Sequence, residues 1–244
     1  MIDIHSHILY GIDDGARDLE ESLAMAEMAA GDGIQQMICT PHMFNGLSND
    51  PQPAEVIDRV AALQKRIGDR LTVLPGNEVH ISHELADQAE KNRFTRLNLG
   101  NYVLVEFPSI SIPFGAVELM YRLQLQRLHP ILVHPERNRE IQMRPSIIGE
   151  YVERGIFIQV TAMSITGEFG SAAKICVEQL LKHKCVHFIA TDAHRAAKRP
   201  PILSRGRDAA AAIVGKKQAR RLVFDNPSAV IGGKLLSVEA PLPF

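Results

Sequence analysis

The chain has 244 residues, of which 45% are hydrophobic and 23% are charged, and its formal net charge is −1. This composition is typical of a globular protein, and it does not suggest nucleic acid as a partner, because no run of Lys or Arg stands out. No apolar run approaches the roughly 18 to 20 residues that a membrane span requires. The three cysteines form no disulfide pattern and the N-terminus lacks the features of a signal peptide, so a reducing, cytoplasmic environment is expected.

Short β-rich segments alternate with longer segments of helical periodicity. The predicted strands are 2–5, 35–40, 71–76, 102–107, 130–134, 156–161 and 186–191. The predicted helices are 18–33, 53–68, 115–128, 145–155, 171–184, 202–215 and 216–227. The first helix is expected to begin at the N-cap Asp18 and to end at the C-cap Gly33. This alternation predicts parallel pairing, and no linker-like segment divides the chain, so we expect one domain over residues 1–244.

Ionisable side chains gather where the predicted strands end. Six of the seven strands carry them, and only the strand that ends in QVTA does not. A lone histidine at a strand end is usually an ordinary surface or core residue, but so many groups at one end indicate a shared metal site. In chain order the groups are His5, His7, Asp13, Asp14, His42, Glu78, Glu106, His134, Glu136, Arg137, Asp192 and His194.

The placement of these groups decides between two parallel folds. Residues two apart in a strand point the same way, so His5 and His7 can bind one ion, as can Asp192 and His194. In a closed barrel the carboxyl ends of the strands meet at one mouth, where barrel enzymes have their active sites. In an open sheet the same ends would lie along a line too long to share a site. We therefore expect an α/β barrel with its active site at the carboxyl ends of the strands.

Motifs along nearly the whole chain resemble one known family. The opening MIDIHSHILYGIDDGARDLEES is followed in order by CTPH, LPGNE, LVEFP, HPERNREI, HFIATDAH and DNP. These motifs resemble the PHP (polymerase and histidinol phosphatase) superfamily and, within it, the bacterial manganese-dependent protein-tyrosine phosphatases of capsule and exopolysaccharide gene clusters. The resemblance implies a distorted seven-stranded β/α barrel that holds three metal ions.

The resemblance also implies the ligands of these ions, all of which follow predicted strands. Mn²⁺ is the implied ion, and iron or zinc would also suit a mixture of imidazoles and carboxylates. Asp3 is expected either to orient a histidine from outside the ligand set or to be only a polar strand start. The implied ligands are His5, His7, Glu78 and Asp192 for the first ion, Glu106 and His134 with the bridging Glu78 for the second, and Asp14, His42 and His194 for the third.

The implied reaction is hydrolysis of a phosphomonoester by a hydroxide that the metal ions activate, without a covalent enzyme intermediate. Arg137 is the candidate for binding the phosphate, because a guanidinium matches phosphate oxygens bidentately; a surface salt bridge with Glu136 is the alternative. Arg199 resembles a second phosphate-contacting arginine of the family. If the reaction uses a general acid, His42 or His194 near the third ion is expected to supply the proton.

Cysteine-based catalysis is the alternative mechanism for a tyrosine phosphatase. It requires a reactive thiolate in a Cys-x5-Arg loop. None of the three cysteines is followed six positions later by arginine, because Asn45, Lys182 and Thr191 stand there. The sequence therefore excludes the thiol mechanism.

Other functions use a similar set of ligands. The alternatives are a histidinol-phosphate or other small-molecule phosphatase, a nuclease, an amidohydrolase, and a metal-stabilised scaffold that binds a kinase without turnover. A dinuclear amidohydrolase commonly has a lysine after the fourth strand, where this chain has Glu106. The family resemblance favours a phosphotyrosine protein as substrate, namely the tail of an autophosphorylated bacterial tyrosine kinase that controls polysaccharide export. An oligomer is compatible with the sequence.

Overall fold

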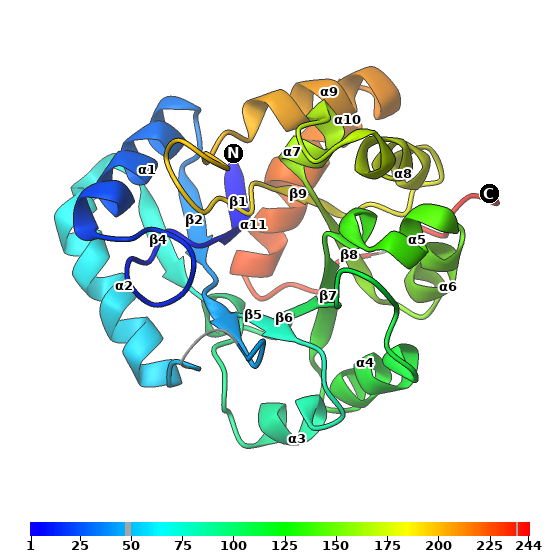
Figure 1. Ribbon diagram of the computed structural model, residues 1–244, viewed down its shortest axis with the longest axis horizontal. Coiled ribbons are helices and arrows are strands. Elements are labelled where there is room, and N and C mark those ends of the chain that lie inside the picture. The colour runs from blue at the N-terminus through cyan, green and yellow to red at the C-terminus, as the bar shows by residue number, and fades with distance from the viewer. Residues whose placement is uncertain (47–49, 238) are drawn as a thin grey trace.

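Parallel strands lie at the centre of the molecule and helices surround them. The computed structural model describes residues 1–46, 50–237 and 239–244. In Figure 1, α1 and α2 lie on one side of the strands, α3 and α4 lie below, and α5, α6 and α8 lie on the opposite side. This arrangement confirms the predicted α/β class, in which each parallel strand returns through a crossover connection.

The strands form two parallel sheets, with the orders β1-β2-β4 and β3-β5-β6-β7-β8-β9. All seven predicted strands are present, but the second and the third are each followed by an additional short strand. The strand bounds are β1 (Ile2–Ser6), β2 (Gln36–Cys39), β3 (His42–Met43), β4 (Thr72–Pro75), β5 (Glu78–His80), β6 (Tyr102–Glu106), β7 (His129–Val133), β8 (Phe157–Thr161) and β9 (Phe188–Ala190).

The two sheets do not join into the continuous, closed barrel that the sequence predicts. In the described ranges, one isolated bridge between Ser6 and Ala193 joins their free edges. On the other side the chain itself passes from one sheet to the other, from β2 to β3 and from β4 to β5. Pro41 has no N–H to continue a ladder. Gly76 lies where an added Cβ would come within 2.9 Å of the Ile38 side chain.

The predicted helices are present with ends that differ by a few residues. Asp18 caps the first by accepting a hydrogen bond from the Glu21 N–H, and the C-cap is Asp32 rather than the predicted Gly33. No helix within the described ranges is both long and apolar enough to cross a membrane. The bounds are α1 (Leu19–Gly31), α2 (Pro53–Ile67), α3 (Leu85–Glu90), α4 (Ala116–Leu125), α5 (Arg139–Met143), α6 (Ile147–Glu153), α7 (Ala162–Thr166), α8 (Ser171–Lys182), α9 (Ser204–Val214), α10 (Lys216–Arg220) and α11 (Asn226–Ile231).

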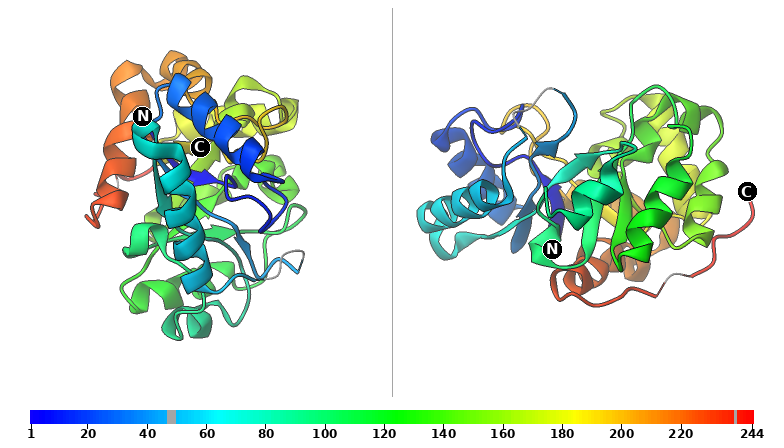
Figure 2. Two further views of the ribbon diagram at one scale, coloured as in Figure 1. Left: turned by 90° about the vertical axis from the view of Figure 1, so that its left-hand side faces the viewer. Right: turned by 90° about the horizontal axis from the view of Figure 1, so that it is seen from below.

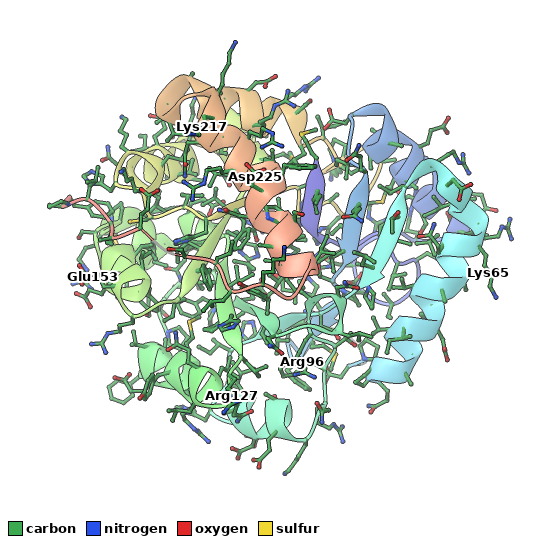
Figure 3. All side chains as sticks on the ribbon, turned by 180° about the vertical axis from the view of Figure 1, so that it is seen from behind. Lys65, Arg96, Arg127, Glu153, Lys217 and Asp225 are labelled. Atoms are coloured by element: carbon green, nitrogen blue, oxygen red, sulfur yellow. The ribbon has the colours of Figure 1, made fainter. Side chains whose placement is uncertain are left out.

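The C-terminal segment covers the amino ends of the strands, on the side away from the loops that follow the strands (Figure 2, right). The predicted helix 216–227 is divided into α10, a π-helical turn over Arg221–Asp225, and α11. Figure 3 shows this segment, with Asp225 labelled, crossing the molecule from behind. The Tyr102 hydroxyl fastens the chain beyond α11 by donating to the Lys234 carbonyl at 2.8 Å and accepting from the Leu236 N–H at 3.0 Å.

Strand β1 contributes to both the apolar interior and the mouth. Ile2 and Ile4 pack in a buried apolar cluster that also contains Val230 of α11. The pairing of β1 with β2 then shifts register between Asp3 and Ser6. Such a bulge re-aims the side chains that follow it. The irregular stretch of β1 includes His5, one of the predicted ligands.

The buried His187, just before β9, gives the fold a pH-dependent stability. Its Nδ1 accepts a hydrogen bond from the Ile158 N–H at 3.0 Å, and burial lowers its pKa from 6.5 to about 4. The unfolded chain therefore takes up this proton more readily, and stability is lost as the pH falls from about 6.5 to about 4. We expect the unfolding free energy of the wild type, relative to His187→Asn, to fall by about 3 kcal/mol across this window.

Urea denaturation in the presence of a chelator measures this difference without a contribution from metal release. Substitution of the exposed His83 by Asn serves as the control. Parallel pH profiles for the wild type and His187→Asn would contradict the prediction.

Candidate metal centre

The nine candidate ligands lie together at the carboxyl ends of the strands. Seven of them line a cavity of about 280 Å³, and His5 and His7 lie next to it against Glu78. Both candidate phosphate-binding arginines line the same cavity. His80 is a rim residue, because it also lines the cavity and its Nδ1 lies 3.4 Å from Glu106 Oε2.

The carboxylate of Glu78, the first residue of β5, is the centre of the cluster and is fully buried. Its Oε2 lies 3.3 Å from the Nε2 atoms of both His5 and His7, and 2.9 Å from His42 Nδ1. Its Oε1 lies 2.8 Å from His134 Nε2. Four imidazoles from three separate parts of the chain therefore meet at one carboxylate.

Asp192 supplies a second buried carboxylate to His5, in β1, and to His7, just after it. Its Oδ1 lies 3.4 Å from His5 Nε2 and 3.3 Å from His7 Nε2. Asp192 has a φ of 50° and His134 a φ of 34°, both in the left-handed region that costs energy for residues other than glycine. Such strain persists where the surroundings hold it, and here the Asp192 N–H donates to the His5 carbonyl at 2.9 Å.

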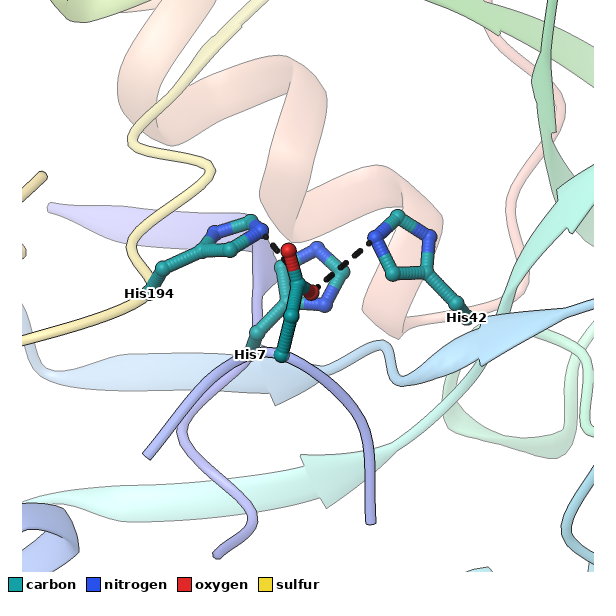
Figure 4. A group of neighbouring side chains, drawn as sticks. His7, His42 and His194 are labelled. Carbon is teal, nitrogen blue, oxygen red and sulfur yellow. Dashed lines mark ion pairs between the residues drawn. The ribbon is translucent and has the colours of Figure 1, made fainter. Parts of the chain in front are cut away.

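On the exposed side of the cluster, Asp14 contacts His42 and one further imidazole, that of His194. Figure 4 shows how the rings of His7, His42 and His194 lie. Asp14 Oδ1 lies 3.4 Å from the Nε2 atoms of both His42 and His194, and the Asp14 side chain is 67% exposed. The ring of His7 lies against both imidazoles, with centroid distances of 4.4 Å to His42 and 4.0 Å to His194. Glu106 approaches less closely, with oxygens 3.9 Å from His42 Nδ1 and from His134 Nε2.

The charges of the cluster are strongly coupled. Burial alone would raise the pKa of Glu78, but the neighbouring His5 and His42 hold it well below its usual range. Burial would likewise raise the pKa of Asp192, but His5 and Arg199 hold it well below its usual range. Burial would lower the pKa of His42, but Glu78 and Asp14 raise it to about 10. The two buried carboxylates thus depend on positive charge from their neighbours.

The donor set fits divalent transition metals. Four groups of side chains have ligand atoms within 4.8 Å of one another, and together they contain all nine candidates. Imidazole nitrogens mixed with carboxylate oxygens suit manganese, iron or zinc better than calcium, which prefers oxygen alone. The groups do not coincide with the three expected sets. They are His7, Asp14, His42 and His194; His5, His134 and Asp192; His5, His7 and Glu78; and His42, Glu78 and Glu106.

Two residues outside the predicted ligand set orient the rings of His5 and His7. Asp13 Oδ2 lies 2.7 Å from His7 Nδ1 and accepts a hydrogen bond from the His42 N–H at 3.1 Å. Gln159 Oε1, in β8, lies 2.9 Å from His5 Nδ1. Each contact leaves the Nε2 atom of the ring directed at the cluster. The role of Gln159 was not predicted, because its side chain is uncharged and lies inside a strand.

Asp3 does not orient a histidine ring, which was one of its two expected roles. Its carboxylate accepts hydrogen bonds from the Thr191 hydroxyl and from the N–H groups of Thr191, at 3.1 Å, and His5, at 3.3 Å. Burial raises the pKa of Asp3 to about 6. Asp3 therefore ties β1 to the end of β9, directly behind the cluster.

Both arginines point at Asp192. Arg137 Nη1 donates to Asp192 Oδ2 at 2.5 Å, and Arg199 Nη2 donates to the same oxygen. The alternative of a surface salt bridge between Arg137 and Glu136 is wrong, because Glu136 is buried and its Oε1 accepts from the Thr161 N–H at 2.9 Å. The cluster thus has a positively charged wall.

Comparison with known proteins gives a family and several relatives. A model of the family described as "Capsular polysaccharide synthesis, CpsB/CapC" matches residues 1–232. The chain is 41% identical over 202 residues to the tyrosine-protein phosphatase YwqE of Bacillus subtilis strain 168, covering 82% of this chain and 79% of that protein. It is 28% identical over 244 residues to the tyrosine-protein phosphatase CpsB of Streptococcus pneumoniae, covering 97% and 100%.

Solved structures share the fold. One chain matches with a TM-score of 0.95 and 35% identity, covering 100% of this chain and 99% of its own length. It comes from work described as crystal structures of YwqE from Bacillus subtilis and CpsB from Streptococcus pneumoniae, unique metal-dependent tyrosine phosphatases. Dihydropyrimidinase from Brevibacillus agri NCHU1002 matches in fold alone, with a TM-score of 0.58 and 11% identity over 98% of this chain and 73% of its own.

The contacts of Asp13 and Gln159 predict an effect on metal affinity. Replacing Gln159 or Asp13 by Leu removes an acceptor that fixes a ring, and we expect Mn²⁺ affinity to fall by roughly 10- to 100-fold. Titration against a competing chelator measures this affinity directly. Gln124→Leu on α4, whose side chain donates to the Arg154 carbonyl away from the cluster, is the matched control. Wild-type affinity in both site variants would show that these contacts do not support the centre.

Proposed function

Because the chain belongs to the CpsB/CapC family of capsular polysaccharide synthesis, we propose that it is a metal-dependent protein-tyrosine phosphatase. The relatives YwqE and CpsB carry the name tyrosine-protein phosphatase. The observation that carries the proposal is one cavity in which two arginines adjoin a buried cluster of imidazoles and carboxylates. A scaffold stabilised by metal but without turnover would not need arginines that face this cavity.

We infer that the nine clustered side chains hold the metal ions, with Mn²⁺ as the first choice and iron or zinc as alternatives. The expected number is three ions per chain, with Glu78 bridging two of them. Such ions would lower the pKa of a bound water and neutralise the charge of the phosphate oxygens. The burial of Glu78 and Asp192 and their shared contacts with His5 and His7 support this assignment, because buried carboxylates need nearby positive charge.

The arginines are proposed to bind the phosphate group. A guanidinium donates two parallel hydrogen bonds to phosphate oxygens, and Arg137 and Arg199 both line the cavity. The phenolate of tyrosine leaves with a pKa of about 10, so it needs less protonation than an alkyl alcohol. The Nε2 atoms of His42 and His194 each lie 3.4 Å from Asp14 Oδ1. If the reaction uses a general acid, we propose that one of these two histidines supplies the proton to the leaving oxygen.

We further propose that the whole chain, residues 1–244, forms a single catalytic domain. In this interpretation β2 and β3 count as one interrupted strand, as do β4 and β5, and the two sheets form a distorted seven-stranded barrel. The proposed substrate is the phosphorylated tyrosine tail of a bacterial tyrosine kinase that controls polysaccharide export. A cytoplasmic location fits this substrate and the three free, buried cysteines.

Substitution of Arg137 tests the proposed phosphate contact. Arg137→Ala removes a charged donor that would stabilise the transferring phosphoryl group, and we expect kcat/KM to fall by roughly 10²- to 10³-fold. Metal content, measured by elemental analysis, should stay at the wild-type value. The exposed Arg139, two residues later, provides the matched control Arg139→Ala, which should retain full activity. Unchanged turnover in Arg137→Ala would remove this residue from the mechanism.

A comparison of substrates tests the function itself. We expect the Mn²⁺-loaded protein to hydrolyse a phosphotyrosyl peptide with a kcat/KM at least roughly tenfold above that for a phosphoseryl peptide of the same sequence or for histidinol phosphate, because phenolate is the better leaving group. Release of inorganic phosphate measures all three reactions. Preference for histidinol phosphate would instead identify a small-molecule phosphatase, and absence of turnover with all three would favour the scaffold.

A further inference from the structure

The two arginines share a contact outside the cavity, the aromatic ring of Phe169. The Cζ atom of Arg137 lies 4.6 Å from the centroid of this ring, and the Cζ atom of Arg199 lies 5.5 Å from it. Both distances are within the range of a cation–π interaction. One ring therefore contacts both guanidinium groups that face the phosphate position.

The local sequence explains how Phe169 reaches this place. It lies in the short connection between α7 and α8, with Gly167 two residues before it and Gly170 directly after it. These two glycines have φ values of 99° and 91°, a backbone conformation that other residues rarely adopt. The connection thus turns sharply on both sides of Phe169, which stays only partly exposed.

The arginines need such a contact because their charges are alike and close together. Both donate to one oxygen, Asp192 Oδ2, which brings the two positive groups side by side. The negative face of an aromatic ring offsets part of this repulsion. Phe169 is not among the described residues that line the cavity, whereas both arginines are. The ring thus contacts the arginines without lining the space that the substrate would occupy.

We propose that Phe169 is a positioning residue that holds Arg137 and Arg199 as one phosphate-binding pair. The proposal rests on the phosphatase function proposed above. Phe169 does not touch the substrate. It restricts both guanidinium groups to orientations in which their N–H groups reach the same phosphate, so that less conformational freedom is lost when the phosphate binds.

The chain contains a matched contact away from the cavity. The Cζ atom of Arg220 lies 4.8 Å from the ring centroid of Phe224, in the C-terminal segment seen from behind in Figure 3, between the labelled Lys217 and Asp225. Substituting Phe224 by Leu removes an equivalent cation–π contact and leaves the cavity intact. Phe224→Leu is therefore the control for Phe169→Leu.

The experiment measures inhibition by inorganic phosphate together with KM and kcat for an aryl phosphate, on Mn²⁺-loaded protein. Each ring–guanidinium contact should contribute roughly threefold to phosphate binding, so Phe169→Leu should weaken inhibition by phosphate roughly tenfold and raise KM similarly. Phe169→Tyr, which keeps the ring, should stay within roughly twofold of the wild type, and Phe224→Leu should equal it. Metal content should be normal in all variants.

A double-mutant comparison separates positioning from a general effect on folding. In an Arg199→Ala background the loss caused by Phe169→Leu should shrink from roughly tenfold to roughly threefold, because only Arg137 remains in contact with the ring. A thermal melt identifies any variant that does not fold, and Phe169→Met then replaces Phe169→Leu in the same assays.

Two results would overturn the proposal while leaving the phosphatase function intact. The first is an active wild type whose phosphate inhibition and KM are unchanged by Phe169→Leu. The second is a loss of equal size in the presence and absence of Arg199. A wild type without any phosphatase activity would instead refute the function on which the proposal rests.

Discussion

The structure depends on the meeting of two buried carboxylates, those of Glu78 and Asp192, with the imidazoles of His5 and His7. Ionised groups of this kind lose their hydration in the interior, at a cost of several kcal/mol each unless a partner compensates. Every histidine within reach of Glu78 contributes to that compensation, and the Nε2 atoms of His5 and His7 lie only 3.3 Å from each other. Such crowding of lone pairs and negative charge is the arrangement that a bound cation stabilises.

The sequence contained most of the residues of this site but only part of its geometry. The strand-end histidines and carboxylates were predicted because parallel strands align their carboxyl ends, whatever the details of the sheet. The hydrogen bond that Gln159 Oε1 accepts from His5 could not be predicted. An uncharged glutamine in a buried strand gives no indication in the sequence of which residue it contacts. The bulge in β1 was also missed, since its shift of register shows only in the pairing of Asp3 and Ser6 with β2.

Asp192 connects the two chemical sides of the cavity. One of its oxygens faces His5 and His7, and the other accepts hydrogen bonds from Arg137 and Arg199. A change at either side therefore acts on the other through one carboxylate. The left-handed backbone of Asp192 follows from this position. The chain must turn immediately after β9 to direct the Asp192 side chain into the cavity, while the Asp192 N–H remains bonded to β1.

The departures from a regular barrel are what bring His42 and Glu78 together. The chain leaves the first sheet at Pro41 and again at Pro75–Gly76, and in each case it begins a new short strand in the second sheet. His42 is the first residue of β3, Glu78 is the first residue of β5, and the two are paired in register. In an uninterrupted strand, side chains would continue to alternate between the two faces of the sheet as they do in β2 or β4. The pairing would then not begin anew at His42 and Glu78. The breaks between the sheets are therefore part of the site, since they place an imidazole and a carboxylate side by side at its centre.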